Sequence, residues 1–543
     1  MRHLPVLDVI SAPTAAPERA AIPRLAPIPD AQVAEFAIED TVLPRFHVWT
    51  LGCQMNRSDS EEMAGALLAS GCSEATGMDD ADLIVINSCA IREAAEQKII
   101  GRMGVLARLK AANPALRIVL TGCSVRADET VDMPRRYPQV DLFLRPDEEP
   151  ELTARLGLAG FTTPGGLSGP SFARVGRGTA ATADRLPGSR AAAVATETVA
   201  RSSAISAWLP IIYGCDKTCT YCIVPFSRGP ERSRPFDQIV EEARSLAAAG
   251  YQEVTLLGQN VNSYGHDLPP EARFAEVGEQ RRLGRDLDLQ GRPDMAALLR
   301  AIDGIRTVDG VPAISRLRFV TSHPWDLTDR LIAAMADCPS VCEHLHLPVQ
   351  SGDDGVLRRM GRQYTADAYL SLVERLRSSI PGISLSTDVI CGFSGESEAA
   401  FENTLALLER VGFDQVFAAA FSVRPGTPAA RLLDDVPPAE KRARLNRLLD
   451  LQERISTARN AAWLGRTTEV LFDGVREEKS HGHASGQGPA GTSSTETPGS
   501  RLTGRNREHR LVHLTGSPDL VGRRVAVTIE RTGPYALAGS IAV

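Results

Sequence analysis

The chain has 543 residues, of which 43% are hydrophobic and 23% are charged, and its formal net charge is −7. This length suffices for about three domains, and no apolar run approaches the roughly 18 residues of a membrane span. The acidic balance excludes a broadly basic nucleic-acid-binding protein, and ten cysteines in so long a chain exclude a disulfide-rich secreted framework. We therefore expect a cytoplasmic protein. Residues 1–43 are rich in Pro and Ala and are predicted to form a disordered leader rather than a signal peptide.

Residues 44–154 alternate between strand-like and helix-like segments. The expected strands are RFHVWTLG (45–52), DLIVINS (82–88) and RIVLTG (117–122), with helices around 58–70 and 91–110. This alternation predicts an α/β domain with a doubly wound parallel sheet. Residues 155–204 are rich in Gly, Pro, Ser and Ala, which predicts a linker.

One cysteine follows each of the three strands: Cys53, Cys89 and Cys123. Because ligands of such sheets bind beyond the carboxyl ends of the strands, we expect the three thiols to converge on one site. A single buried cysteine is a common packing residue, but three at the same position of successive strands favour ligands.

A second set of three cysteines lies in the stretch IYGCDKTCTYCIVPFSRGPERSRP (212–235), at Cys215, Cys219 and Cys222. Iron–sulfur clusters with four irons normally take four cysteines, so three would leave one iron open to a ligand. Zinc is the alternative, although its cysteines usually come as two separated pairs, and plain buried cysteines are another. Tyr221 precedes the third cysteine, where its ring could pack on a bound ligand.

Between residues 205 and 458 we expect six strand–helix units, which predict a partial (β/α)6 barrel with its chemistry at the carboxyl ends of the strands. The expected strands after the one near Trp208 are 253–258, 316–321, 344–350, 384–392 and 415–423. Polar residues that follow these strands should line the same mouth as the cysteine loop: Gln259, Asn260, Ser322, His323, Gln350, Ser351 and Glu396.

The last segment, 460–543, is predicted to be a small all-β barrel, interrupted by a low-complexity insertion at 477–500. From residue 500 onward it has seven arginines against three acidic residues. This local net charge of +4 suits contact with a phosphate backbone, although a barrel can also carry a positive face incidentally.

The cysteine loop resembles the signature of the radical S-adenosylmethionine (radical SAM) enzymes, and its continuation CIVPFSRGPERSRP resembles that of the methylthiotransferases. GCQMNRSDSEEMAG (52–65), NSCAIREAAEQKIIGRMG (87–104) and TGCSVRAD (121–128) resemble the amino-terminal domain of that family, in particular its MiaB-type branch, which acts on tRNA. The segments GRNREHRLVHL and PYALAGSIAV resemble a TRAM domain, an RNA-binding barrel.

The resemblance implies two [4Fe–4S] clusters, one at each set of cysteines, and S-adenosylmethionine (SAM) as cofactor. It implies SAM contacts at Gln259, Asn260, Gly392 and Glu396, and we expect Tyr221 to contact SAM as well. RNA contacts are expected at Arg505, Arg507 and Arg510 in the TRAM segment.

The reaction implied is insertion of a methylthio group at an unactivated C–H carbon of N6-isopentenyladenosine next to the tRNA anticodon (position 37). One electron from the radical SAM cluster cleaves SAM to a 5′-deoxyadenosyl radical, the other cluster carries the sulfur, and a second SAM supplies the methyl group. The expected partners are tRNA, an electron donor such as a flavodoxin or ferredoxin, and a sulfur and cluster supply system. The alternatives are a methylthiotransferase for threonylcarbamoyladenosine or a ribosomal protein, and a non-catalytic RNA-binding iron–sulfur protein.

Overall fold

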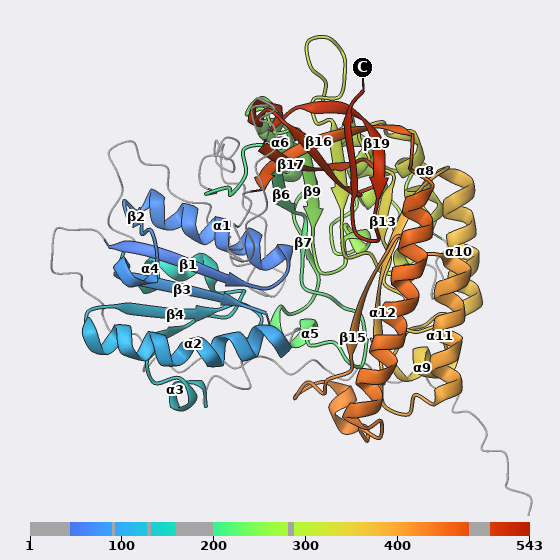
Figure 1. Ribbon diagram of the computed structural model, residues 1–543. Coiled ribbons are helices and arrows are strands. Elements are labelled where there is room, and N and C mark those ends of the chain that lie inside the picture. The colour runs from blue at the N-terminus through green and yellow to red at the C-terminus, as the bar shows by residue number, and fades with distance from the viewer. Residues whose placement is uncertain are drawn as a thin grey trace, which may run out of the picture.

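The computed structural model describes residues 44–89, 93–126, 132–158, 199–280, 287–476 and 500–542 (Figure 1). The predicted leader at 1–43 lies outside these ranges, as do most of the predicted linker (159–198) and of the low-complexity insertion (477–499). None of the helices in the described ranges has the length and apolar content needed to cross a membrane.

The amino-terminal domain is a parallel sheet in the order β2-β1-β3-β4-β5, which confirms the α/β expectation. Helices α1 and α2 cover opposite faces of the sheet (Figure 1). The elements are β1 (Arg45–Leu51), α1 (Gln54–Ala69), β2 (Ser73–Glu74), β3 (Leu83–Ser88), α2 (Glu93–Ala112), β4 (Arg117–Thr121), α3 (Met133–Arg136), β5 (Leu142–Phe143) and α4 (Leu152–Arg155).

The sequence prediction misses β2 and β5, because two residues are too few to show the alternation typical of a strand. Strand β3 is buried at every position, as expected for the centre of a sheet covered on both faces. Leu156 and Leu158 pack in the core of this domain, so the domain extends past the predicted linker boundary at 155.

The middle domain has six strands in sequential order, as predicted. Two three-stranded parallel sheets, β12-β9-β6 and β13-β14-β15, meet at a bridge between Leu317 and Val341. The strands are β6 (Ser206–Pro210), β9 (Glu253–Leu257), β12 (Arg316–Phe319), β13 (His344–His346), β14 (Ser384–Cys391) and β15 (Gln415–Ala420).

Helices cover the outside of this partial barrel (Figure 1). They are α6 (Phe236–Ala248), α7 (Met295–Asp303), α8 (Asp329–Asp337), α9 (Asp354–Arg359), α10 (Ala366–Ser379), α11 (Glu398–Val411) and α12 (Pro438–Ala461), whereas the short α5 (Val224–Ser227) lies between the two domains. The hydroxyl oxygens of Thr328, Thr365 and Ser397 accept hydrogen bonds from free N–H groups in the first turns of α8, α10 and α11, and Ser and Thr are preferred capping residues. Two short antiparallel strand pairs are β7 (Ile212–Tyr213) with β8 (Arg232–Ser233), and β10 (Glu279–Gln280) with β11 (Leu287–Asp288).

The carboxyl-terminal domain is a closed barrel in the order β16-β17-β18-β20-β19, which confirms the small β-barrel. Its strands are β16 (Thr467–Arg476), β17 (Ser500–Asn506), β18 (Leu511–Gly516), β19 (Arg524–Thr532) and β20 (Leu537–Ile541). The sequence prediction misses β17, because this strand follows directly on the low-complexity segment and contains Gly and Asn, which are rare in strands.

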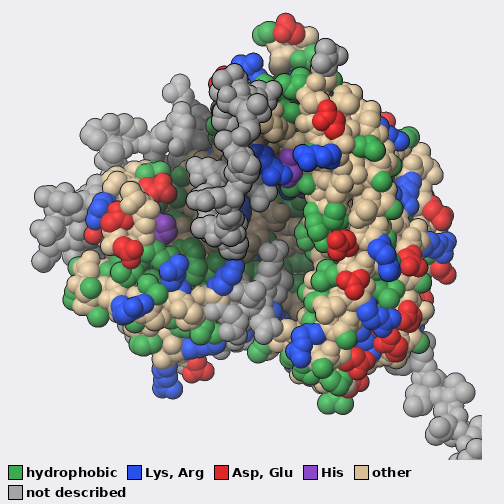
Figure 2. All heavy atoms as spheres, in the orientation of Figure 1, with side chains coloured by type: hydrophobic (Ala, Val, Ile, Leu, Met, Phe, Trp, Pro, Cys, Tyr) green, Lys and Arg blue, Asp and Glu red, His purple; other side chains and the backbone are tan. Residues whose placement is uncertain are grey.

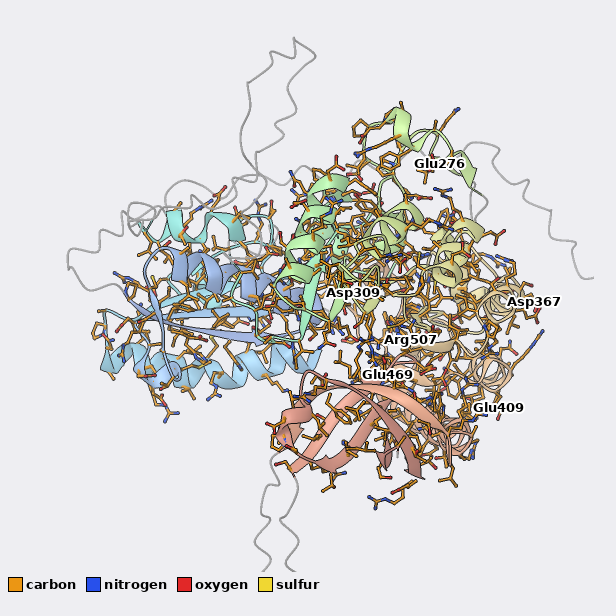
Figure 3. The ribbon with its side chains drawn as sticks, turned by 90° about the horizontal axis from the view of Figure 1, so that it is seen from above. Glu276, Asp309, Asp367, Glu409, Glu469 and Arg507 are labelled. Atoms are coloured by element: carbon orange, nitrogen blue, oxygen red, sulfur yellow. The ribbon has the colours of Figure 1, made fainter. Side chains whose placement is uncertain are left out.

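The carboxyl-terminal barrel packs against the end of the middle domain where its strands begin. Arg316 is fully buried there and donates to the Glu469 carbonyl oxygen at 3.1 Å and the Glu469 carboxylate at 3.2 Å. Figure 3 shows Glu469 and Arg507 at this boundary, whereas Asp367 and Glu409 lie at the outer edge of the molecule.

Candidate active site

The three amino-terminal cysteines lie just beyond the ends of three adjacent parallel strands, as predicted. Cys53 follows β1 and caps α1, Cys89 follows β3, and Cys123 follows β4. Cys89 and Cys123 are 1% and 2% exposed. Gly122 has a φ of +91°, and a Cβ there would lie 2.4 Å from the carbonyl oxygen of Ser88. Only glycine fits this turn, and the turn places Cys123 beside the end of β3.

Two buried asparagines support this site. The Asn56 side chain donates to the Asn87 amide oxygen at 2.8 Å, and Asn87 donates to the carbonyl oxygen of Asn56 at 2.8 Å. The amide oxygen of Asn56 also lies 3.4 Å from the sulfur of Cys53. In the sequence both residues stand out only as parts of longer motifs, because a buried amide pair leaves no periodic signal.

The second cysteine loop is fixed by the barrel. Gly214 has a φ of +76°, and a Cβ there would lie 2.1 Å from the carbonyl oxygen of Pro230, so the turn before Cys215 requires glycine. The Gly214 N–H donates to the Gln259 side-chain oxygen at 2.5 Å. The Thr220 hydroxyl donates to the carbonyl oxygen of Arg359 at 2.8 Å. Gln259, expected to contact SAM, therefore holds the cysteine loop.

Each cysteine set has one cysteine in contact with a buried arginine, and the two arginines are different. Arg228 Nε donates to the Cys123 sulfur at 3.1 Å, and its Nη2 donates to Asp59 at 2.5 Å. Arg362 Nη1 donates to the Cys219 sulfur at 3.5 Å. Neither arginine is predicted as a site residue, because nothing in a sequence distinguishes a buried arginine from a solvated one.

The two cysteine loops meet at Arg228, which follows Cys222 by six positions and donates to the Cys123 sulfur of the other set. Burial raises the pKa of Cys123 to about 12, Arg228 opposes the rise, and Cys89 and Cys53 add to it. Burial likewise raises the pKa of Cys222 to about 12, Cys219 adds to the rise, and Cys123 of the other set contributes a smaller part. A metal that binds these thiols must displace their protons, because the thiolate is the ligand.

The donor sets fit iron–sulfur clusters: each offers three thiols, with a guanidinium that can offset their negative charge. Among the described residues, no three histidine, cysteine or carboxylate side chains converge on a single metal ion. In a four-iron cluster each thiolate binds a different iron, so its ligands are spread more widely than those of one ion.

Asn260 lies in a buried polar group beside the cysteine loop. Its Nδ2 donates to Asp326 at 2.6 Å, and Asp326 also pairs with Lys217 at 2.7 Å. Burial raises the pKa of the neighbouring Glu231 to about 7, while Lys217 opposes the rise. The Asn260 side-chain oxygen is buried and accepts no hydrogen bond from the described residues, so it can accept one from a bound ligand.

Tyr221, Gly392 and Glu396 come together through the turn after β14. The ring of Tyr221 packs edge-to-face against Phe393, with centroids 6.5 Å apart. Gly392 donates its N–H to the Glu396 carboxylate at 2.6 Å, and Arg444 pairs with the same carboxylate at 2.9 Å. In the structure Glu396 therefore shapes this turn through protein contacts.

The three arginines expected to contact RNA are half-buried and have protein partners, so their RNA contact stays a prediction. Arg507 pairs with Glu343 at 2.8 Å, Arg510 pairs with Asp414, and Arg505 Nη1 donates to the carbonyl oxygen of His509 at 3.0 Å. The contacts of Arg507 and Arg510 dock the carboxyl-terminal barrel on the middle domain. The sequence shows the positive charge of this segment but not the direction in which each guanidinium points.

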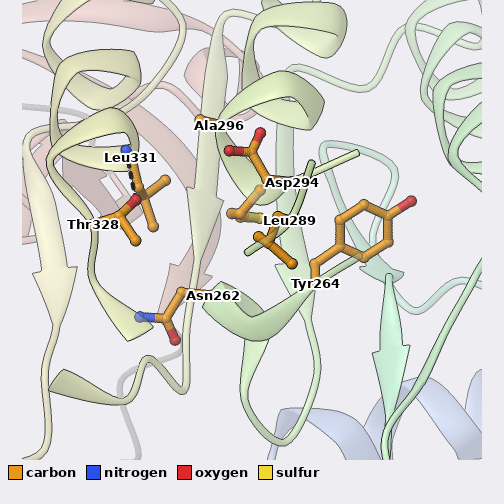
Figure 4. Close-up of a pocket in the computed structure, with 8 residues that line it drawn as sticks. Asn262, Tyr264, Leu289, Asp294, Ala296, Thr328 and Leu331 are labelled. Carbon is orange, nitrogen blue, oxygen red and sulfur yellow. Dashed lines mark hydrogen bonds between the residues drawn. The ribbon is translucent and has the colours of Figure 1, made fainter. Parts of the chain in front are cut away.

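A small cavity lies elsewhere, between the segment after β9 and helices α7 and α8 (Figure 4). Its polar wall includes Asp294, which caps α7 and pairs with Arg330 at 2.9 Å. Thr328 in the same wall accepts from the Leu331 N–H. These polar groups serve the helix ends, and none of the residues that line the cavity is a predicted site residue.

Two models of known protein families match this chain, one in the middle domain and one in the amino-terminal domain. Residues 209–408 match the family model described as "Radical SAM superfamily", and residues 45–145 match the one described as "Uncharacterized protein family UPF0004". Each match covers one of the two cysteine sets.

Three curated relatives share one name, tRNA-2-methylthio-N(6)-dimethylallyladenosine synthase. The relative from Chloroflexus aurantiacus is 41% identical over 502 residues, covering 91% of this chain and 91% of the relative. The relative from Roseiflexus sp. is 40% identical and covers 92% and 90%. The relative from Acetivibrio thermocellus is 39% identical and covers 91% and 90%.

Proposed function

The chain belongs to the family of the tRNA-2-methylthio-N(6)-dimethylallyladenosine synthases, which are radical SAM enzymes, and from this premise we propose how its residues serve the reaction. It is a methylthiotransferase that converts N6-isopentenyladenosine next to the tRNA anticodon (position 37) to its 2-methylthio derivative. Two SAM molecules are consumed. Threonylcarbamoyladenosine and ribosomal protein, the alternative targets, are not favoured by the names of the relatives.

The observation that carries the mechanism is the contact between the two cysteine loops: Arg228, six positions after Cys222, donates to the Cys123 sulfur at 3.1 Å. Membership of the radical SAM superfamily implies SAM and one [4Fe–4S] cluster, which we assign to Cys215, Cys219 and Cys222. We assign a second, auxiliary cluster to Cys53, Cys89 and Cys123. When bound, the first supplies the electron that cleaves SAM, and the second supplies the sulfur that is transferred.

The chain's own residues hold these thiols in place. Gln259 and the barrel carbonyl groups fix the loop of the first set, and Asn56 with Asn87 fixes the turn of the second. On the SAM side, the buried Asn260 oxygen, which accepts no hydrogen bond from the described residues, is an acceptor of the kind that suits the amino group of the cofactor. Tyr221 and the Gly392–Glu396 turn would line the same mouth, with Glu396 acting through the shape of the turn.

The substrate base must leave the anticodon loop to reach both cysteine sets, as unstacked RNA bases do when proteins read them. Figure 2 shows Lys and Arg side chains on the exposed surface of both the amino-terminal domain and the rest of the molecule, on the face where the two parts meet. The arginines exposed on the carboxyl-terminal barrel are suited to phosphate contact: Arg501, Arg523, Arg524 and Arg531.

The remaining requirements come from outside the chain. The reaction needs an electron donor such as a flavodoxin or ferredoxin, and a sulfur and cluster supply system to restore the sulfur after each turnover. Because tRNA and these partners are cytoplasmic, we place the enzyme in the cytoplasm.

Nucleoside analysis of tRNA from a strain lacking this protein tests the function. Loss of 2-methylthio-N6-isopentenyladenosine, with accumulation of N6-isopentenyladenosine, is expected. Persistence of the methylthio nucleoside would refute this substrate. An assay for 5′-deoxyadenosine under reducing conditions separates the enzyme from a non-catalytic RNA-binding protein, which would form none.

A further inference from the structure

Arg228 connects the two cysteine sets, although nothing in the family resemblance assigns it a role. It follows Cys222 by six positions, at the end of helix α5, which lies between the two domains (Figure 1). Its side chain leaves the middle domain and reaches Cys123 in the other domain, where Nε lies 3.1 Å from the sulfur. The residue therefore belongs to the loop of one cysteine set and contacts the other.

Asp59 fixes the guanidinium in this position. The Arg228–Asp59 pair is 2.5 Å long, and both side chains are only 4% exposed. Two charges are costly to bury, and they are stable there only when their geometry and hydrogen bonding are good. The planar fork of arginine lets one edge bind the carboxylate while Nε remains directed at the sulfur.

A hydrogen bond from a cation to a ligand sulfur changes the redox properties of a cluster. Reduction adds negative charge to the cluster, so a nearby N–H donor and positive charge stabilise the reduced form more than the oxidised form. Hydrogen bonds to the sulfurs are among the factors that set the reduction potential of iron–sulfur clusters, and bonds from charged donors are roughly twice as strong as neutral ones.

We propose that Arg228 is a positioning residue that raises the reduction potential of the auxiliary cluster through its hydrogen bond to Cys123, and that it fixes this cluster against the radical SAM loop. The inference rests on the proposed auxiliary cluster at Cys53, Cys89 and Cys123. It adds a residue that links the two cluster sites across the domain boundary.

Arg362 provides a matched control within the same chain. It is also a buried arginine, 6% exposed, and its Nη1 donates to a ligand sulfur, Cys219, at 3.5 Å. Its Nη2 donates to the carbonyl oxygen of Pro348 at 2.6 Å, so these contacts stay within the middle domain. Arg362 should therefore act on the radical SAM cluster, and Arg228 on the auxiliary cluster.

The test is a potentiometric titration of the reconstituted full-length protein, followed by electron paramagnetic resonance, together with iron analysis. The variants are Arg228→Met, Arg228→Met/Asp59→Leu and Arg362→Met. The double variant replaces the buried pair by apolar groups, a change that proteins often tolerate, and thus covers the case in which Arg228→Met alone does not fold. Variants that lack one cysteine set identify which signal belongs to which cluster.

Both Arg228 variants should lower the reduction potential of the auxiliary cluster and leave that of the radical SAM cluster unchanged. Arg362→Met should lower the potential of the radical SAM cluster and leave that of the auxiliary cluster unchanged. For Arg228→Met we expect about a tenfold change in the ratio of reduced to oxidised cluster at a fixed potential, or about 59 mV for one electron. An auxiliary potential equal to that of the wild type in an Arg228 variant that retains both clusters would overturn the inference. Absence of the auxiliary cluster from the wild type would instead refute the proposed function on which the inference rests.

Discussion

Arg444→Met removes the cationic partner of a carboxylate buried between helix α12 and the turn after β14. Arg444 Nη1 donates to the Glu396 carboxylate at 2.9 Å and to its carbonyl oxygen at 2.8 Å. The two side chains are 3% and 1% exposed. Without the guanidinium, Glu396 keeps one donor, the Gly392 N–H at 2.6 Å.

Breaking a buried ion pair from one side costs about 3–5 kcal/mol of folding free energy. Because the Gly392 N–H remains, we expect a loss of about 3 kcal/mol for Arg444→Met. The control is Arg447→Met on the same helix. Arg447 also pairs with two glutamates, Glu398 and Glu402, but these side chains are 44–56% exposed, so its loss should cost about 0–1 kcal/mol.

Urea denaturation followed by circular dichroism measures both variants. Burial raises the pKa of Glu396, and loss of the cation should raise it further. A raised carboxyl pKa means that the folded protein retains a proton that the unfolded chain releases, so the stability of Arg444→Met falls as pH rises from the ordinary to the raised value. The cost should therefore be larger at pH 8 than at pH 5. Equal costs for the two variants, or a cost independent of pH, would show that Glu396 does not depend on Arg444 for its charge.

The remaining predictions concern the roles of the two cysteine sets, a half-buried glutamate and the RNA surface. Cys219→Ala should abolish 5′-deoxyadenosine formation, whereas Cys89→Ala should retain it and stop thiolation; equal loss of SAM cleavage in both would contradict the assignment of the clusters. Burial raises the pKa of Glu62 from 4.5 to about 8, so the ionised folded form loses stability between these values. Glu62→Gln should then stabilise the protein at pH 8.5 by about 1–3 kcal/mol, since one pKa unit is about 1.4 kcal/mol and partial exposure screens part of the effect; thermal unfolding should show no gain at pH 4. Arg501→Glu/Arg523→Glu should weaken tRNA binding and reduce the slope of log affinity against log salt by about one for each phosphate that the variant no longer binds, and an unchanged slope would place the RNA elsewhere.

The parallel sheet and the grouping of six cysteines into two sets could be predicted from the sequence. Both depend on short patterns that recur along the chain. Each of Cys53, Cys89 and Cys123 follows an apolar strand, and parallel strands bring their ends to one edge. The other three cysteines lie within one short loop. These positions depend on spacing in the chain, which the sequence shows directly.

The residues that support the cysteines could not be predicted in the same way. Arg228 and Asp59 are far apart in sequence, and only the docking of two domains brings them together. The arginines of the last barrel show the opposite case: charge alone suggests an RNA surface, yet Arg507 faces Glu343 on the middle domain. A sequence gives the charge of a side chain but not the surface toward which it points.

The central claim is that one chain holds two clusters. The most direct test measures the iron and sulfide content of the anaerobically reconstituted protein and records its Mössbauer spectra. The wild type is compared with the variant in which Cys53, Cys89 and Cys123 are all replaced by alanine. We expect about eight irons in the wild type and about four in the variant, as for two four-iron clusters. About four irons in both would contradict the mechanism, because the amino-terminal thiols would then hold no cluster to supply the transferred sulfur.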